Sequence, residues 1–356
     1  MQDMNKGVAT QSVIEQRKQR WRELYDPAAG RKAVFMVGMN DPASPGAPYV
    51  PPYPENKAAR IDAAMQNYHV MLDRAGWLDD DAIPFAEVHT GTEIFAEVFG
   101  CGVYRNDGSM PSARPVVFEP RDVAKLKVRP VMDSPLAMLF EIGDELRRRA
   151  GGDVLLKIPD IQSPMDIAAL IWDKTSFYMG IHDDPHAVED LALMCRELLI
   201  EFCDLWLARY GRDFIAHYPP YYMPVGLTLS EDEIGSVSPE MFTRFFLPHL
   251  KALSDHYGGL GMHCCATARH QWDNLKTIPN LKILNLTRGL EETEEGIVYF
   301  ADHCVQIHDG MPGDRPTEWY LQHAPTARVV IRPWAEDRAG AQRFVEQLRP
   351  YCDRKR

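Results

Sequence analysis

Apolar and polar residues alternate along this chain with two different periods, one typical of helices and one typical of strands. The changes between these periods predict its secondary-structure elements. Residues 11–25 repeat apolar positions at helical spacing, and an apolar run at residues 33–38 indicates a strand that leads into a loop. A proline-rich segment, residues 42–54, follows. It is too long for a tight turn, so we expect an ordered loop that either lies on the surface or covers a pocket.

From residue 154 onward, short apolar runs alternate regularly with helical stretches. The clearest helix boundaries are Asp184 and Pro185, which suit the first positions of a helix, and Gly211, which suits the residue after its end. The predicted strands are residues 154–158, the segment that carries His263, and residues 282–286, 305–308 and 328–332. The predicted helices are residues 164–179, 185–210, 268–275, 292–301, 317–323 and 336–348, with one more that starts at Ser238 and Pro239.

This alternation predicts parallel strands joined by helical crossovers. Because it continues to the end without a second compositional regime, it favours a closed (β/α)8 TIM barrel over a doubly wound sheet. We expect residues 1–32 to form an amino-terminal helical extension and residues 33–356 to form a single barrel. No GxGxxG motif follows a predicted strand, so the main signal of a dinucleotide-binding fold is absent. The pattern does not decide whether the extension packs on its own barrel or on a partner, and the oligomeric state stays open.

Composition narrows the class of protein. The 356 residues are 45% hydrophobic, which is enough for a sizeable core. The formal charge of −12, with basic residues clustered only in the tail at residues 353–356, argues against nucleic acid or an anionic membrane as a partner. The chain shows neither a secretory signal pattern nor a long apolar run, so we expect a cytoplasmic location. Its seven cysteines form no CxxC framework, which favours reduced thiols over disulfides.

The run Gly-Leu-Gly-Met-His-Cys-Cys-Ala-Thr at residues 259–267 is the most informative local feature. On a strand, His263 and Cys265 would share one face and Cys264 would take the other. An imidazole and a thiolate in this arrangement can reach one divalent ion, and zinc is the first candidate. Both residue types also occur in cores without a metal, so the metal interpretation depends on further ligands.

In a barrel, active-site residues lie at the carboxyl ends of the strands. The predicted ends carry Asn40, Asp160, His263 with Cys265, Asn285 with Thr287, His308 with Asp309, and Arg332 with Trp334. We expect His308 to be a third metal ligand or an acid/base group, although an ordinary hydrogen-bonded loop histidine would have the same sequence. Asp309 could orient His308 or simply form a turn.

The remaining polar residues are expected to bind a small-molecule substrate. Arg332 suits a substrate carboxylate because its planar guanidinium can bind two oxygens, while a surface ion pair is the alternative. Asp160 is a second candidate for proton transfer. The expected substrate-binding set is Asn40, Asn285, Arg332, Trp334 and Tyr222, the last from the loop rich in tyrosine and proline at residues 217–224.

Between residues 163 and 348 the chain resembles the uroporphyrinogen decarboxylase superfamily, which includes cobalamin-dependent methyltransferases. The resemblance rests on Ser-Pro-Met-Asp at 163–166, Asp-Asp-Pro at 183–185, Ser-Pro-Glu-Met-Phe at 238–242, Phe-Leu-Pro at 246–248 and His-Cys-Cys at 263–265. It implies a barrel of this family's type. In the methyltransferase branch, a His-x-Cys and a later cysteine near the last strand hold zinc, which binds an acceptor thiol.

The match to that branch is incomplete in two respects. His263 and Cys265 fit the first two ligands, but residues 329–334 contain no cysteine. Either His308 replaces it, the acceptor supplies more of the coordination, or no zinc is bound. The chain also lacks an Asp-x-His-x-x-Gly corrinoid motif, so a corrinoid would arrive on a separate protein. The decarboxylase branch's arginine-rich amino-terminal motif is absent near residues 39–49, which disfavours a true uroporphyrinogen decarboxylase.

Three functional hypotheses result. The leading one is a zinc-dependent methyltransferase that works with a separate corrinoid protein, either from methyl-corrinoid to a thiol or in the demethylation of a small methylated substrate. The second is a metal-free decarboxylase or lyase, with Asp160 or His308 as the proton donor and Arg332 holding a small carboxylate. The third is a non-catalytic binding protein that uses the barrel pocket without turnover.

Overall fold

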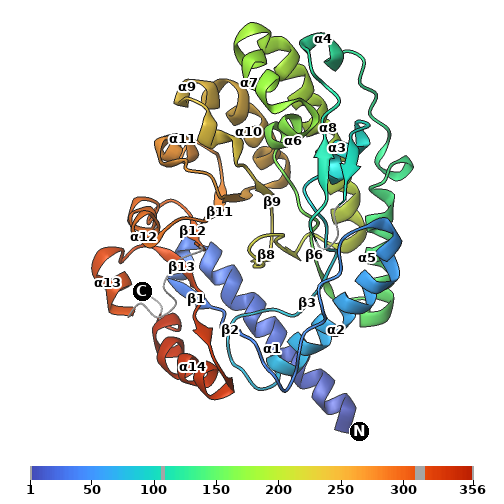
Figure 1. The fold of residues 1–356 in the computed structure, drawn as a ribbon. Helices are drawn as coiled ribbons and strands as arrows, with labels where there is room; N and C mark the ends of the chain where they lie inside the picture. Colours follow the sequence, from blue (N-terminus) through green and yellow to red (C-terminus); the bar gives the residue numbers. More distant parts are fainter. Residues whose placement is uncertain (1, 106–108, 309–316, 355–356) are drawn as a thin grey trace.

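Parallel strands surrounded by helices make up the computed structural model, which describes residues 2–105, 109–308 and 317–354 (Figure 1). Six strands form one parallel sheet in the order β1-β13-β12-β11-β10-β9. Their bounds are β1 (Ala33–Phe35), β9 (Leu227–Ser230), β10 (Leu260–Cys264), β11 (Leu281–Leu286), β12 (Val305–Gln306) and β13 (Arg328–Ile331). All five pairings in this sheet are parallel.

A second sheet has the order β3-β6-β7-β8. Its strands are β3 (Phe85–Glu87), β6 (Leu155–Lys157), β7 (Phe214–Ile215) and β8 (Tyr222–Met223), and only β8 runs antiparallel to its neighbour. The two sheets meet at both edges. Gln162, beyond β6, bridges Ser230 of β9, and the Asp81 amide, before β3, donates to the Phe35 carbonyl of β1.

The predicted α/β fold with parallel pairing is therefore confirmed, but the prediction of a closed sheet is too strong. Among the described residues, the strands form two arcs joined by a few hydrogen bonds at each edge, without one continuous ladder. Two short sheets lie outside these arcs. They are β2 (Gly38–Met39) with β14 (Trp334–Ala335), and β4 (Gly102–Tyr104) with β5 (Ser112–Arg114).

Helices form the outer layer around the strands (Figure 1). The larger ones are α2 (Lys57–Ala75), α5 (Ala137–Ala150), α6 (Pro164–Ile171), α7 (Lys174–Asp183), α8 (Pro185–Tyr210), α10 (Leu247–Tyr257), α12 (Leu290–Tyr299) and α14 (Arg338–Cys352). The shorter ones are α3 (Ile94–Val98), α4 (Pro120–Val123), α9 (Pro239–Met241), α11 (Trp272–Leu275) and α13 (Thr317–His323). No helix in the described ranges combines the length and the apolar character needed to span a membrane.

Helix α8 agrees with its predicted bounds. The Asp184 side chain accepts a hydrogen bond from the Ala187 amide, Pro185 occupies the first turn, and Gly211 after the helix has a φ of 98°, which favours glycine. The helix predicted at residues 164–179 is instead two helices. The Asp173 side chain caps α7 by accepting from the Ser176 amide, and the extended backbone of Trp172 ends α6.

The amino-terminal helix α1 (Gln2–Tyr25) packs against both sheets of its own chain. Trp21 is fully buried, and its indole Nε1 donates to the Asp81 carbonyl at 2.8 Å. The Tyr25 hydroxyl donates to the Tyr222 carbonyl at 3.0 Å. These contacts answer the question that the helical pattern left open, whereas the domain boundary at residue 32 stays a prediction.

Candidate functional site

A polar cavity of about 420 Å³ lies at the carboxyl ends of β3, β6, β7, β9, β10 and β11. Its lining includes the last residues of β3, β6 and β9, which are Glu87, Lys157 and Ser230. The carboxyl ends of parallel strands converge at one edge, which is where ligands bind in this class of fold. The cavity is therefore the candidate active site.

One wall of the cavity holds a group of three potential metal ligands. Atoms of Asp232, His263 and Cys265 that can bind a metal all lie within 4.8 Å of one another. The side chain of Cys264 is buried on the opposite face of β10. This matches the predicted alternation, which put His263 and Cys265 on one face of the strand. A carboxylate, an imidazole and a thiolate are all ligands that zinc accepts.

Asn285 on the neighbouring strand β11 fixes the orientation of His263. The Nδ1 of His263 lies 2.5 Å from Asn285 Oδ1, and Asn285 Nδ2 donates to the Ile307 carbonyl. Because the amide nitrogen is used in this way, Oδ1 is the acceptor, and His263 Nδ1–H donates a hydrogen bond to it. The Nε2 lone pair of His263 is then available to a metal, which is the usual role of such a supporting residue.

Asp166 supports the loop that carries Asp232. Its carboxylate accepts hydrogen bonds from the Asp232 amide at 2.9 and 3.1 Å and from the Glu233 amide at 3.0 Å. Asp166 is itself held in the first turn of α6, where its amide donates to the Ser163 side chain. Burial raises the pKa of Asp166 above its usual value. The Ser-Pro-Met-Asp motif at residues 163–166 thus positions a potential metal ligand.

Asp232 also governs the state of the cysteine. Its Oδ1 accepts a hydrogen bond from the Cys265 amide at 2.5 Å. Partial burial and the hydrogen bond with Asp232 raise the pKa of the Cys265 thiol to about 12. A thiol in this setting keeps its proton at neutral pH unless a cation compensates the negative charge.

The lining from β3, β6 and the loop after β7 carries two further groups of ionisable side chains. Lys157 Nζ donates to Glu87 Oε1 at 2.5 Å, and His89 Nδ1 lies 3.4 Å from the same oxygen. Burial alone would raise the pKa of Glu87, but the His89 hydrogen bond and the Lys157 charge outweigh it and lower the pKa to about 2. Glu87 is therefore a permanent carboxylate, paired with Lys157.

The second group centres on His217, in the loop after β7. Its Nε2 lies 2.9 Å from Ser230 Oγ and 3.6 Å from Asp160 Oδ1. Burial lowers the pKa of His217 to about 4, so the ring is neutral at physiological pH. A neutral imidazole between a hydroxyl and a carboxylate can orient a polar group of a substrate.

The proline-rich loop at residues 42–54 reaches the rim of this cavity. The ring of Tyr49 makes an edge contact with the His89 ring, with centroids 5.8 Å apart, and the Tyr49 hydroxyl lies 3.1 Å from Met110 Sδ. Both His89 and Met110 line the cavity. This supports the interpretation of the segment as a loop that borders a pocket.

The predicted site residues fall into separate groups. Asp160, His263, Cys265 and Thr287 share the polar cavity, and Asn285 is buried behind His263. Tyr222, His308, Arg332 and Trp334 instead line a second cavity, and the exposed Asn40 lines neither of the two. Asp309 lies outside the described residues.

His308 is not brought to the metal-ligand group, contrary to its expected role there. Its Nδ1 accepts from the Leu286 amide and its Nε2 pairs with Gln306 Oε1, both at 3.0 Å. Asp232 occupies the third position instead. The sequence signal for Asp232 was the alternation Leu-Thr-Leu-Ser at residues 227–230, a short strand that we did not predict and that ends in Glu-Asp-Glu.

Comparison with known proteins agrees with this arrangement. The family model "Uroporphyrinogen decarboxylase (URO-D)" matches residues 71–307, about two thirds of the chain. The chain belongs to this family. The match confirms the resemblance seen in the sequence and implies a TIM-barrel fold for the two arcs of strands. It begins within α2, so α1 and the proline-rich loop lie outside it.

Among solved structures, a methyltransferase from Methanosarcina mazei is similar in fold, with a TM-score of 0.60. The alignment covers 91% of this chain and 94% of that protein at 13% sequence identity. Identity at this level supports the fold alone. A search among curated proteins found no match.

Proposed function

We propose that this member of the uroporphyrinogen decarboxylase family is a zinc-dependent methyltransferase that acts with a separate corrinoid protein. The observation that carries the proposal is the group formed by Asp232, His263 and Cys265 in the polar cavity. Three protein ligands with a position left for substrate are typical of catalytic zinc, whereas structural zinc usually has four. The similarity in fold to the methyltransferase from Methanosarcina mazei is consistent with this proposal.

The three ligands fit zinc in their charge and in their orientation. Asp232 and a deprotonated Cys265 would balance the two positive charges of zinc, and His263 would bind through its free Nε2. Asn285 keeps His263 in the required tautomer, and Asp166 keeps the Asp232 loop in place. Zinc bound there would hold the sulfur of an acceptor thiol and lower its pKa.

The rest of the cavity lining would bind and orient the small-molecule partner. The Lys157 and Glu87 pair and the neutral His217 supply fixed donors and acceptors in the same cavity as the metal ligands. The chain lacks an Asp-x-His-x-x-Gly corrinoid motif, so the corrinoid would approach the site on its own carrier protein.

The decarboxylase alternative has less support. It required Asp160 or His308 to act on a carboxylate held by Arg332, but Asp160 lines the polar cavity, while His308 and Arg332 line the second one. Only the mechanism with His308 as the proton donor has its residues in one cavity. Both ring nitrogens of His308, however, already have protein partners.

Methyl transfer can be measured directly with methylcobalamin as the donor and 2-mercaptoethanol as the acceptor. The methyl group passes from cobalt to sulfur and both bonding electrons stay on cobalt, so formation of cob(I)alamin is followed by its absorbance under anaerobic conditions. We expect the zinc-loaded protein to accelerate the reaction at least tenfold. Cys265→Ser should abolish this acceleration, and Cys264→Ala, which changes the neighbouring thiol on the other face, should retain it.

Two results would contradict the proposal. One is the same rate with and without the zinc-loaded protein, both in this direction and in the reverse reaction of cob(I)alamin with 2-(methylthio)ethanol. The other is an acceleration that Cys265→Ser leaves unchanged.

A further inference from the structure

A second cavity, of about 390 Å³, lies between the two arcs of strands. Its lining is largely apolar and includes Met36, Ile83, Phe85, Ile215 and Tyr221. The interior of a (β/α)8 barrel is normally filled by layers of side chains and contains no large void. A void of this size matches the volume of small-molecule sites, so its contents require an explanation.

The second cavity adjoins the polar cavity along two strands. On β3, Phe85 lines the second cavity and Glu87 lines the polar one. On β7 and the loop that follows it, Ile215 lines the second cavity and His217 lines the polar one. Side chains two residues apart on a strand share a face and are separated by about 6–7 Å. The two linings therefore follow one another along the inner faces of these strands.

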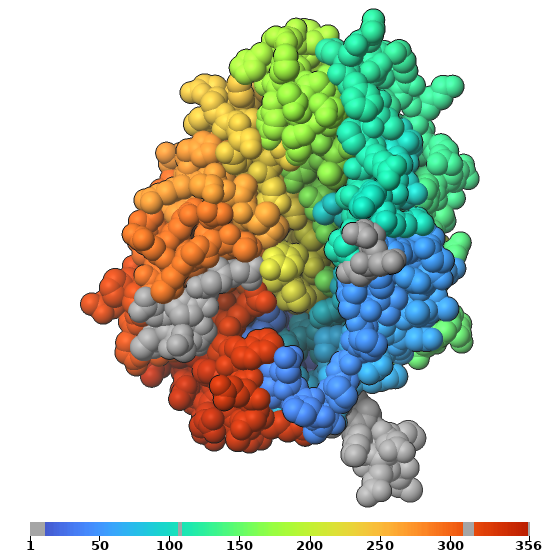
Figure 2. All heavy atoms as spheres, in the orientation of Figure 1, coloured from blue at the N-terminus to red at the C-terminus, as the bar shows by residue number. Residues whose placement is uncertain are grey.

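The surface is open near this cavity. Figure 2 shows a hollow bounded by blue, yellow and red segments of the chain. The lining residues at 36–38, 220–222 and 332–334 belong to segments of these three colours. Trp334 forms part of the rim, since it is 63% exposed and its ring packs directly on Gly38.

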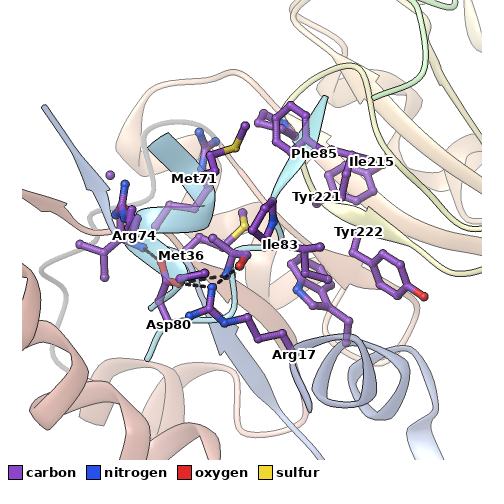
Figure 3. Close-up of a pocket in the computed structure, with 18 of the residues that line it drawn as sticks. Arg17, Met36, Met71, Arg74, Asp80, Ile83, Phe85, Ile215, Tyr221 and Tyr222 are labelled. Carbon is purple, nitrogen blue, oxygen red and sulfur yellow. Dashed lines mark hydrogen bonds and ion pairs between the residues drawn. The ribbon is translucent and has the colours of Figure 1, made fainter. Parts of the chain in front are cut away.

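One side of the second cavity is charged, and the charge is mainly positive. Figure 3 shows Arg74 and Asp80 on the side away from Phe85 and Ile215. The described lining contains three guanidinium groups, from Arg17, Arg74 and Arg332, against the single carboxylate of Asp80. Asp80 is matched to Arg17, whose Nη1 lies 3.3 Å from Asp80 Oδ1.

The two arginines on this side, Arg17 and Arg74, are held in place by backbone carbonyls. Arg17 uses its Nη1 and Nη2 on the carbonyls of Ala82 and Leu78, both at 2.5 Å, and Arg74 donates through Nη2 to the Val37 carbonyl. These bonds fix the guanidinium groups without neutralising them, and Asp80 is the one carboxylate in the described lining. A ligand on this side would meet an excess of positive charge, and guanidinium groups bind anionic oxygens well.

We propose that the second cavity binds a carboxylate with an aromatic or apolar body, with its negative end toward Arg74 and its body against Phe85, Ile215 and Tyr221. The far end of such a ligand points along β3 and β7 toward the polar cavity. The last step rests on the function proposed above. If that function is correct, the ligand is the small-molecule substrate and its reacting end lies at the metal ligands. Apolar contact would then supply affinity, and the arginine side would select for an anion.

Binding can be tested on the full-length protein with 2-naphthoate as the probe and 2-naphthalenemethanol as its neutral analogue. Isothermal titration should give saturable binding of 2-naphthoate, at least tenfold tighter than that of the alcohol. Met71→Trp, which fills the cavity from α2, should weaken binding at least tenfold, and Arg74→Met should remove most of the preference for the anion. The matched controls Met132→Trp and Arg121→Met, at exposed positions outside the cavity, should bind as the wild type does.

A carboxylate could also bind directly to a metal, so the titration is repeated after removal of metal by a chelator. Binding that survives chelation and is lost in Met71→Trp supports the second cavity, whether or not methyl transfer is observed. The inference is overturned if the wild type shows no saturable binding. It is also overturned if binding disappears with the metal while Met71→Trp leaves the affinity unchanged.

Discussion

The burial of His217 predicts a measurable part of this protein's sensitivity to acid. The residue is only 5% exposed, its Nδ1 has no hydrogen-bond partner within the described residues, and burial lowers its pKa to about 4. In the unfolded chain the pKa of a histidine returns to about 6.5. The unfolded state therefore binds more protons than the folded state between these two values, and stability falls as the pH drops below about 6.5.

Linkage gives the magnitude. With pKa values of about 6.5 unfolded and about 4 folded, His217 lowers the free energy of unfolding by about 2 kcal/mol between about pH 7 and about pH 5. In His217→Gln, a side chain that does not titrate, the loss of stability over this range should be smaller by that amount. Urea denaturation followed by tryptophan fluorescence at the two pH values measures the difference.

The control is His186→Gln, since the His186 side chain is 85% exposed. This variant should lose as much stability between the two pH values as the wild type does. The reasoning is refuted if His217→Gln behaves in the same way as this control, because His217 would then be accessible to water and free to accept a proton.

Three further predictions concern the residues that support the site. Asn285→Leu removes the acceptor for His263 Nδ1 and should weaken zinc binding about 10- to 100-fold in a chelator competition assay; unchanged affinity would mean that Asn285 does not orient the ligand. Asp166→Ala leaves the amides of Asp232 and Glu233 without their acceptor, so urea denaturation should show a loss of about 1–3 kcal/mol together with weaker zinc binding; a stable variant with normal zinc affinity would contradict the role of Asp166. Ser163→Ala removes the cap of α6 and should lower the free energy of unfolding by about 1 kcal/mol. The same substitution at an exposed serine that caps no helix should cost less than half of this.

The part of the fold that could be predicted from the sequence depends on local signals. The strand that carries His263 has a side-chain period of two, so the shared face of His263 and Cys265 follows from spacing alone. The bounds of α8 follow from its aspartate cap and its terminal glycine, because both act within a few residues of the helix end.

The remaining features depend on contacts between distant segments. Strand β9 is only four residues long, and its identity as a strand depends on pairing with β10, so Asp232 was not recognised as a ligand. Strand β3 is three residues long and was missed for the same reason. We expect His308 at the metal from sequence because the carboxyl ends of barrel strands converge. Its distance from His263, however, depends on the places of β10 and β12 in the sheet, which local sequence patterns do not give. The second cavity involves side chains from α1, α2, the second sheet and the segments that follow β1, β12 and β13, and no local pattern predicts it.

The most direct test of the account is the zinc content of tag-free protein, measured by mass spectrometry after zinc loading and removal of excess metal. We predict about one zinc per chain in the wild type and in Cys264→Ala, and little or none in Cys265→Ser and Asp232→Asn. A wild type that holds no zinc would contradict the central claim. So would zinc that is retained in full by both Cys265→Ser and Asp232→Asn, because the metal would then be bound elsewhere.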